Sequence, residues 1–423
     1  MRRLTLALAA AALLVLSALP VAGQGDGVTL TAWVPPVLTD AQQKMIADYE
    51  AASGNTIQQE VFPVPFEQAL LTKWATGERP DILFWHAIGN WLVQLDPPTN
   101  LQDLSEEPFV ERTVGGLLDQ SATYQGSIYG SVINYPFLNG VFYNKPLFAE
   151  HDISIPSNYE DLKATCAEIQ EKAPGVAPIY IGGGDQWPLQ VLTFMMWNSE
   201  LKDSDLIDRV NRNEATLADP VFVSGIEKLQ ELQQLGCLND DILTATYENE
   251  QSALMEGSAA MVFQGTWIVG ALQDAFGLDA LNETVGFFGL SAQDDVVSWQ
   301  TVGSGAVFLP RTGDEAREAA ARDFVDWVTG DGYAQYLADS KQFPVIQGHE
   351  APADVPAVLV EANEAFLENG TAQWQQTLQA AYGPFETFLQ EMIAAQLSPQ
   401  DVGDELAREF AQSARDLGLP GFE

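Results

Sequence analysis

GERPDILFW, at residues 77–85, is the stretch of the sequence that decides the fold class. It ends in four consecutive apolar residues, and a run of this length suits a β-strand that is covered on both faces, as in a parallel sheet. Upstream, residues 28–33 and 57–62 are rich in apolar and β-branched side chains and predict two more strands. Helical patterns separate the three strands. This β-α-β-α-β order predicts an open α/β lobe with helices on both faces of the sheet.

The pattern of the first helix is marked at both ends. Thr39 and Gln42 form a capping box, and Gly54 is expected to end the helix in the left-handed conformation. Further helices are predicted at residues 158–172, 221–235, 316–328 and 333–339, further strands at 177–181 and 302–309, and a mostly helical region at 357–417. A chain of 423 residues without an internal repeat or a low-complexity linker indicates two lobes that the chain connects more than once.

Composition excludes several classes of partner. The chain has 19 basic and 59 acidic residues, which gives a formal net charge of −40. Nucleic acids and anionic membranes both require a basic surface, so neither is an expected partner. The acidity is typical of a solvated surface that keeps an abundant exported protein in solution.

The N-terminus has the organisation of a secretory signal. Arg2 and Arg3 precede an apolar run at residues 4–19, Pro20 breaks the run, and residues 21–23 are small. We therefore expect residues 1–23 to be a signal peptide. Gln24 stands where a bacterial lipoprotein would carry its lipidated cysteine. The expected product is an exported protein, periplasmic or extracellular, that is not anchored by lipid at this position.

Two cysteines, Cys166 and Cys237, fall in the same half of the chain. In an oxidising compartment an even number of cysteines allows one disulfide, which we expect here. Two buried free thiols are the alternative.

Five short stretches occur in a recognisable order. They are GERPDI at 77–82, YGSV at 129–132 followed by YP at 135–136, VFYNKPLF at 141–148, GSAAM at 257–261 with GTW at 265–267, and GSG at 303–305 with FPV at 343–345. In order and spacing they resemble the extracellular solute-binding proteins of family 1, the sugar-binding group that includes maltose-binding protein. The resemblance covers roughly residues 28–350.

The resemblance implies the type II periplasmic-binding-protein fold, in which two discontinuous α/β lobes, joined by three crossings at a hinge, hold the ligand in a central cleft. It places lobe 1 at residues 28–137 and 288–330, and lobe 2 at 138–287 and 331–423. The implied function is capture of a mono- or oligosaccharide by cleft closure and its delivery to the membrane permease of an ABC transporter. We expect a monomer without a cofactor or a bound metal.

Sugars present apolar C–H faces, which flat aromatic rings cover, and hydroxyl groups, which fixed polar groups bind. Aromatic residues at strand ends and beside glycine-rich loops are therefore the first candidates. Trp187 follows such a loop at 182–185, where we expect the missing side chains to let a ligand approach the backbone. The candidate ligand-binding residues are Trp33, Trp85, His86, Tyr135, Asp185, Trp187, Trp267, Ser304, Lys341, Phe343 and Tyr382. Each tryptophan has a place in the core as its alternative, and Asp185 has the capping of a turn.

Sequence motifs of enzymes are missing. The sequence has no GxxxxGK phosphate loop, no GxSxG elbow, and no CxxC or HxxxH metal-ligand pair, so no catalytic residue is assigned. Two alternatives stay open. One is the same receptor role for a polyamine, a cation or a peptide. The other is a secreted glycan-active enzyme, because 59 acidic residues leave room for a carboxylate pair.

Overall fold

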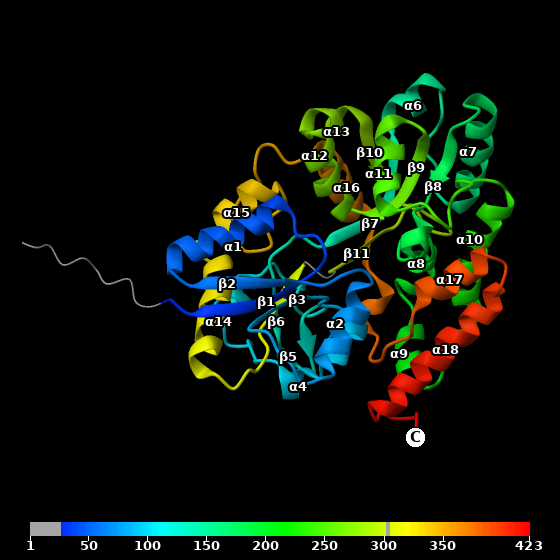
Figure 1. Ribbon diagram of the computed structural model, residues 1–423. Helices are drawn as coiled ribbons and strands as arrows, with labels where there is room; N and C mark the ends of the chain where they lie inside the picture. The colour runs from blue at the N-terminus through cyan, green and yellow to red at the C-terminus, as the bar shows by residue number, and fades with distance from the viewer. Residues whose placement is uncertain (1–26, 302–304) are drawn as a thin grey trace, which may run out of the picture.

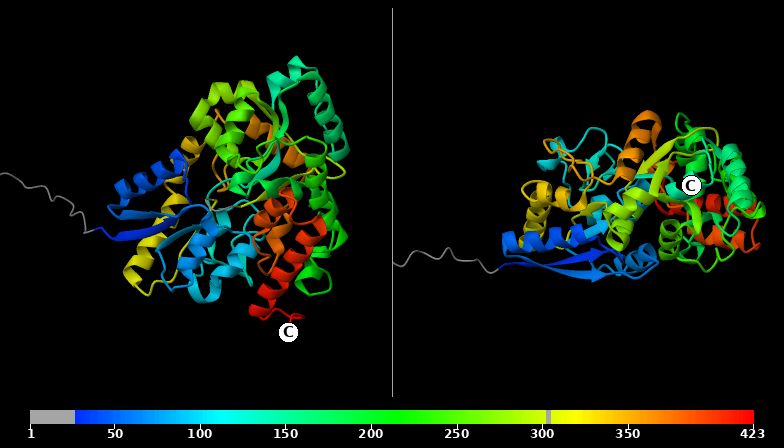
Figure 2. Two further views of the ribbon diagram at one scale, coloured as in Figure 1. Left: turned by 45° about the vertical axis from the view of Figure 1, so that its right-hand side comes forward. Right: turned by 90° about the horizontal axis from the view of Figure 1, so that it is seen from above.

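The computed structural model of the chain describes residues 27–301 and 305–423. The expected signal peptide at 1–23, Gln24 and Ser304 lie outside the described residues. Two α/β lobes lie side by side, and each is built around its own sheet (Figures 1 and 2).

The sheet of the first lobe has five strands in the order β2-β1-β3-β12-β6. The strands are β1 (Thr29–Val34), β2 (Thr56–Val61), β3 (Ile82–Trp85), β6 (Gly130–Val132) and β12 (Ala306–Phe308). β1 runs parallel to β2 and β3, as predicted, whereas β12 runs antiparallel to β3 and β6. All four residues of β3 are buried, which agrees with its unbroken apolar run.

Asp81, which directly precedes the apolar run of β3, is a buried carboxylate that holds three segments of the first lobe together. Asp81 is 1% exposed, and its Oδ2 accepts hydrogen bonds from the backbone N–H of Thr31 at 2.6 Å and from the guanidinium of Arg317. One side chain thus ties β1 and the entry to β3 to a helix more than two hundred residues away. A buried charge needs such partners.

Helix α1 (Asp40–Ser53) confirms the predicted ends. Thr39 and Gln42 form the capping box, and Gly54 ends the helix with φ 77°. The other helices of this lobe are α2 (Phe66–Trp74), α3 (Gly89–Leu92), α4 (Pro97–Asn100), α5 (Phe109–Arg112), α14 (Glu315–Val328) and α15 (Tyr333–Ser340), and β4 (Thr123–Tyr124) pairs with β5 (Ser127–Ile128) in a small hairpin.

The sheet of the second lobe has the order β13-β11-β7-β9-β8, and β10 also pairs with β7. Its strands are β7 (Phe137–Asn144), β8 (Ala177–Tyr180), β9 (Ala259–Gly265), β10 (Val285–Phe288), β11 (Val297–Gln300) and β13 (Gly370–Ala372). Side chains alternate across this sheet. Phe142 and Val262 face a core that is continuous with that of the first lobe, whereas Val141 and Met261 face a second core on the other side.

Helices cover both faces of the second sheet (Figure 1). They are α6 (Lys145–Glu150), α7 (Tyr159–Lys172), α8 (Leu189–Leu201), α9 (Leu206–Asn211), α10 (Pro220–Gln234), α11 (Tyr247–Glu256), α12 (Trp267–Phe276), α13 (Leu278–Thr284), α16 (Ala357–Asn369), α17 (Phe385–Ile393) and α18 (Pro399–Asp416). The C-terminal region is mostly helical, as predicted, but it also contains β13 and the 3-10 turn Trp374–Thr377.

Two segments differ from the lobe boundaries expected at residue 288 and residue 331. β11 pairs with β7, so residues 297–300 belong to the second sheet rather than to lobe 1. α15 packs on α1, so residues 333–340 belong to the first lobe rather than to lobe 2. Long-range pairing decides both placements. The chain crosses between the sheets after β6, after β11 and before α16.

The expected disulfide is absent from the structure. Cys166 and Cys237 are free, and each is only 1% exposed. The two thiols face each other, and their hydrogen bond, followed by burial, raises the pKa of the Cys166 thiol. The alternative of two buried thiols is therefore the one that the structure contains.

Candidate binding cleft

A cavity of about 320 Å³ lies between the two lobes. The first lobe lines it with residues 35–37, residues 64–67, and the chain that follows β3. The second lobe lines it with residues 185–187, Trp267 and the chain at 382–386. Since β1 and β3 both end at this edge, the cavity occupies the crevice where open α/β sheets bind ligands.

Aromatic side chains line both sides of the cavity. On the first lobe, Trp91 stacks on His86, with ring centroids 5.3 Å apart and planes 23° apart. On the second lobe, Trp187 meets Trp267 edge to face, with centroids 5.9 Å apart. All three tryptophans are partly exposed, so their rings are available to a ligand in the cavity.

Trp267 is placed by the junction of a strand and a helix. β9 ends at Gly265, and α12 begins at Trp267. A Cβ on Gly265 would lie only 2.2 Å from Cζ3 of the indole, so the ring rests directly on the glycine backbone. The indole N–H donates to Oε1 of Gln264 at 2.7 Å, which fixes the plane of the ring.

Behind Trp267 lies the fully buried carboxylate of Glu250. Gln264 Nε2 donates to one of its oxygens, and the backbone N–H of Gly182 donates to the other at 2.8 Å. Burial raises the pKa of Glu250 to about 8, against the effect of these two donors, and the charge of Asp185 adds to the rise. The side chains of Gln264 and Glu250 thus connect Trp267 to the glycine loop that precedes Trp187.

That loop, at residues 182–185, corrects one expectation. Its three glycines were predicted to let a ligand approach the backbone. Instead, a Cβ on Gly182, Gly183 or Gly184 would meet the backbone of residues 242–247 at 2.5–2.8 Å. The glycines are needed for close packing of two chain segments. Asp185 lines the cavity and also accepts from the backbone N–H of Tyr247 at 2.8 Å, at the start of α11 rather than in the turn that follows Asp185.

Two glutamates face the cavity from opposite lobes. Glu67 Oε1 lies 2.9 Å from Nε2 of His86. Burial opposes ionisation of Glu67, yet the hydrogen bond and charge of His86 hold its pKa below the ordinary value. Glu386 lies in the first turn of α17. Burial raises the pKa of Glu386 to about 7, and the charge of Glu67 contributes to the rise.

Several polar groups of the cavity have no partner among the described residues. The Oδ1 atom of Asn139 is buried and unpaired, although its Nδ2 donates to Ser298 and Gln373. Gln190 and Gln300 also line the cavity, and no described residue bonds to their side chains. Buried polar groups are normally satisfied, so these groups are available for a hydroxylated ligand.

Five of the predicted site residues come together in this cavity. They are His86, Asp185, Trp187, Trp267 and Tyr382. Tyr382 is 4% exposed, and its hydroxyl accepts from Nε2 of Gln375. Residues separated by almost three hundred positions in the sequence therefore share one site.

Trp33 and Trp85 do not reach the cavity. Trp33 is 3% exposed and packs against Phe62, with ring centroids 5.2 Å apart. Trp85 is fully buried, and its indole N–H donates to the carbonyl of Trp91 at 3.2 Å. Both tryptophans lie within their strands, Trp85 as the last residue of β3 and Trp33 one residue before the end of β1, and both belong to the core.

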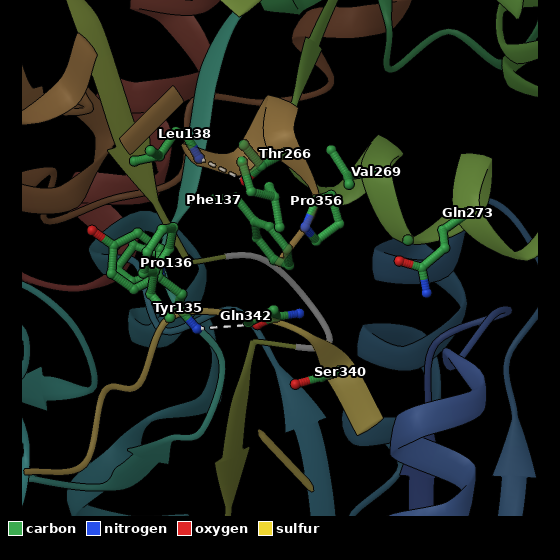
Figure 3. A pocket seen from close by; sticks show the side chains of 13 residues that line it. Tyr135, Pro136, Phe137, Leu138, Thr266, Val269, Gln273, Ser340, Gln342 and Pro356 are labelled. Atoms are coloured by element: carbon green, nitrogen blue, oxygen red, sulfur yellow. Dashed lines mark hydrogen bonds between the residues drawn. The ribbon is translucent and has the colours of Figure 1, made fainter. Parts of the chain in front are cut away.

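Tyr135 and Phe343 lie in a second, smaller cavity of about 50 Å³ beside the lobe crossings (Figure 3). Their rings are 5.3 Å apart, and the backbone N–H of Tyr135 donates to Oε1 of Gln342 at 3.3 Å. Lys341 lines neither cavity, because its ammonium pairs with Asp354 at 2.9 Å. These three predicted residues are therefore separate from the large cavity.

The sequence interpretation missed Trp91, Glu67 and Glu386. Trp91 lies just beyond the third strand, two residues after Gly89. The other candidate tryptophans were chosen from positions of the same kind, at strand ends or near glycines. Glu386 follows the loop that contains Tyr382. Nothing in the local sequence distinguishes Glu67 from the other acidic residues.

Residues 27–301 and 305–423 lack two kinds of feature. No helix there has the length and apolar character needed to cross a bilayer. Within the same residues, no group of three or more His, Cys, Asp or Glu side chains is arranged to hold a metal ion.

Comparisons with known proteins agree with this architecture. The chain is 31% identical over 199 residues to an uncharacterized ABC transporter extracellular-binding protein of Pyrococcus horikoshii, and the match covers 46% of this chain and 45% of that one. It is 22% identical over 401 residues to the melibiose/raffinose/stachyose-binding protein MelE of Bacillus subtilis, with 91% and 89% covered.

Solved structures show the same fold. A chitin oligosaccharide binding protein superposes with a TM-score of 0.78 at 21% identity, covering 92% of this chain and all of that one. RafE in complex with raffinose superposes with a TM-score of 0.71 at 20% identity, with 92% and 100% covered. The two-lobe type II fold is therefore confirmed. The pattern of bacterial extracellular solute-binding proteins matches residues 44–366, about three quarters of the sequence. This chain belongs to the bacterial extracellular solute-binding protein family.

Proposed function

We propose that this protein is exported, captures a mono- or oligosaccharide in the cavity between its lobes without transforming it, and delivers the sugar to the permease of an ABC transporter. The observation that carries the proposal is the pairing of aromatic rings and unpaired polar groups in one cavity. Trp91 faces the cavity from the first lobe, and Trp187 and Trp267 face it from the second. Rings of this kind cover the C–H faces of a sugar, while Asn139 and Gln300 offer partners for its hydroxyls.

The binding mechanism is closure of the lobes. The two groups of aromatic residues belong to different lobes, so a sugar that touches both is bound more tightly when the lobes approach. A ligand shifts the open and closed populations only through this difference in affinity. The closed form then presents the surfaces of both lobes together to the permease.

The relatives support a sugar as the ligand. MelE is described as a binding protein for melibiose, raffinose and stachyose, and the superposed structures include a chitin oligosaccharide binding protein and RafE with raffinose. A signal peptide at residues 1–23, a monomeric state and release without a lipid anchor at Gln24 belong to the same proposal.

One observation favours a second function, a glycan-active enzyme. Glu67 and Glu386 line the cavity from opposite lobes, and their pKa values move in opposite directions, as in a pair of acid and base. The family relationship favours binding. The experiment below therefore includes a search for products.

A thermal-shift screen of the mature protein tests the proposal. The ligands are mono- and oligosaccharides, with polyamines, divalent cations and peptides as comparisons. A ligand at about a hundred times its dissociation constant adds about 2.7 kcal/mol, which raises the melting temperature by several degrees. We expect a shift with one class of sugar and no new product by chromatography. A response to polyamines or cations alone would overturn the sugar, and consumption of the sugar would overturn the binding role.

A further inference from the structure

Resting on the proposed function, the cavity also indicates which sugars it accepts. We propose that it selects saccharides that carry a positively charged amine, and that Glu67 and Glu386 hold the ammonium group between the two lobes.

Charge is distributed unevenly around the cavity. Its lining contains three carboxylates, those of Glu67, Asp185 and Glu386, and it contains no lysine or arginine within the described part of the chain. Among the described residues, His86 is the one basic side chain in that lining, and Glu67 is its partner. A uronic acid or a sugar phosphate would therefore meet repulsion without a compensating cation.

Glu386 is the carboxylate that a ligand can pair. No described residue forms a salt bridge or a side-chain hydrogen bond with it, whereas Glu67 has His86 and Asp185 has the backbone of Tyr247. Glu386 is half-buried, and a partly desolvated carboxylate without a cationic partner is stabilised when a cation binds beside it.

A second feature is independent of the carboxylates. Oδ1 of Asn139 is an acceptor on a residue that is 1% exposed and lines the cavity, and it has no partner among the described residues. Its amide nitrogen is already used by Ser298 and Gln373, so Oδ1 is the part of this side chain that can still bind. Oδ1 of Asn139 and the carboxylate oxygens are acceptors, which match a ligand that offers N–H and O–H donors.

The two glutamates also connect the amine to closure. Glu67 belongs to the first lobe and Glu386 to the second, so their repulsion opposes the approach of the lobes. An ammonium between them converts this repulsion into attraction on both sides. The tryptophans on each side hold the sugar rings, which distinguishes this ligand from a simple polyamine.

Isothermal calorimetry with matched probes tests the inference. Glucosamine oligomers carry free amines, and N-acetylglucosamine oligomers of the same length are neutral. Hydrogen bonds to charged groups are strong enough that we expect the amine probe to bind about tenfold more tightly or better. Glu386→Gln should reduce the ratio of the two affinities about tenfold, and Glu67→Gln should also reduce it. Glu391→Gln is the matched control, because it removes one charge from the same helix outside the cavity lining and should leave the ratio unchanged.

The outcomes separate this inference from the function on which it rests. Neutral sugars that bind as well as amines, or a ratio that Glu386→Gln leaves unchanged, would overturn the inference and leave sugar capture standing. Binding of spermidine with no binding of any saccharide would overturn both. Melting curves of the variants show whether a lost ratio reflects unfolding, and if Glu386→Gln unfolds, the ratio measured with Glu67→Gln decides.

Discussion

Replacing Glu250 by glutamine should change how the stability of the protein depends on pH. Glu250 is fully buried and has no cationic partner among the described residues, and its pKa is raised from 4.5 to about 8. At a pH between these two pKa values, Glu250 is protonated in the folded protein and ionised in the unfolded chain. Stability should therefore fall as the pH rises through this window, because the unfolded state binds fewer protons.

The magnitude follows from the difference between the two pKa values. They differ by about 3.5, and each pKa unit corresponds to about 1.36 kcal/mol, so the full window is worth up to about 5 kcal/mol. Glutamine has nearly the same shape and does not titrate. The variant should therefore gain about 3 to 4 kcal/mol on the wild type between about pH 5 and pH 8.

Guanidinium denaturation of both proteins across this pH range measures the difference. Glu248→Gln on the same helix is the control, because Glu248 is exposed. Its stability should follow that of the wild type at every pH. If Glu250→Gln and wild type lose stability in parallel from pH 5 to pH 8, the buried carboxylate is not protonated at neutral pH, and the reasoning fails.

Two further predictions concern single sites. Gly265→Ala should weaken sugar binding about tenfold or more, because the new Cβ would lie 2.2 Å from the ring of Trp267. Gly270→Ala is the control and should keep the affinity, because the nearest atom to its new Cβ is 3.7 Å away. Calorimetry compares the two variants, and equal affinities would contradict the packing argument. Thiol titration of the protein unfolded without reductant should count two thiols, from Cys166 and Cys237, and a count of zero would show that a disulfide forms between them.

Local signals predicted the parts of the fold that local contacts decide. The capping box at Thr39, the left-handed Gly54 and the buried run of the third strand depend on residues close in sequence, and all were found where expected. The pairing of β11 with β7 and the packing of α15 on α1 join segments far apart, and these were misplaced. The resemblance set the overall arrangement but not the exact points of crossing.

In the site, too, the sequence predicted features that depend on neighbouring residues and missed features that depend on distant ones. Trp267 was identified from a short motif, and the structure gives the motif a reason, since Gly265 provides the surface on which the indole lies. Trp85 and Trp91 lie within seven residues of each other, yet one is core and the other lines the cavity. Their difference depends on where the strand ends. Glu67 and Glu386 are 319 positions apart, and only the folded chain brings their charges together.

The three crossings have a consequence for how the protein can be divided. Each lobe is assembled from separate stretches of the chain, because β12, α14 and α15 return to the first lobe after β11 has joined the second. Neither lobe can therefore be produced as one continuous fragment. A protease that cuts at one crossing leaves strands of both fragments paired in one sheet, as β12 pairs with β3 and β6 and β13 pairs with β11. The nicked protein should then run as two bands on a denaturing gel but elute as one particle.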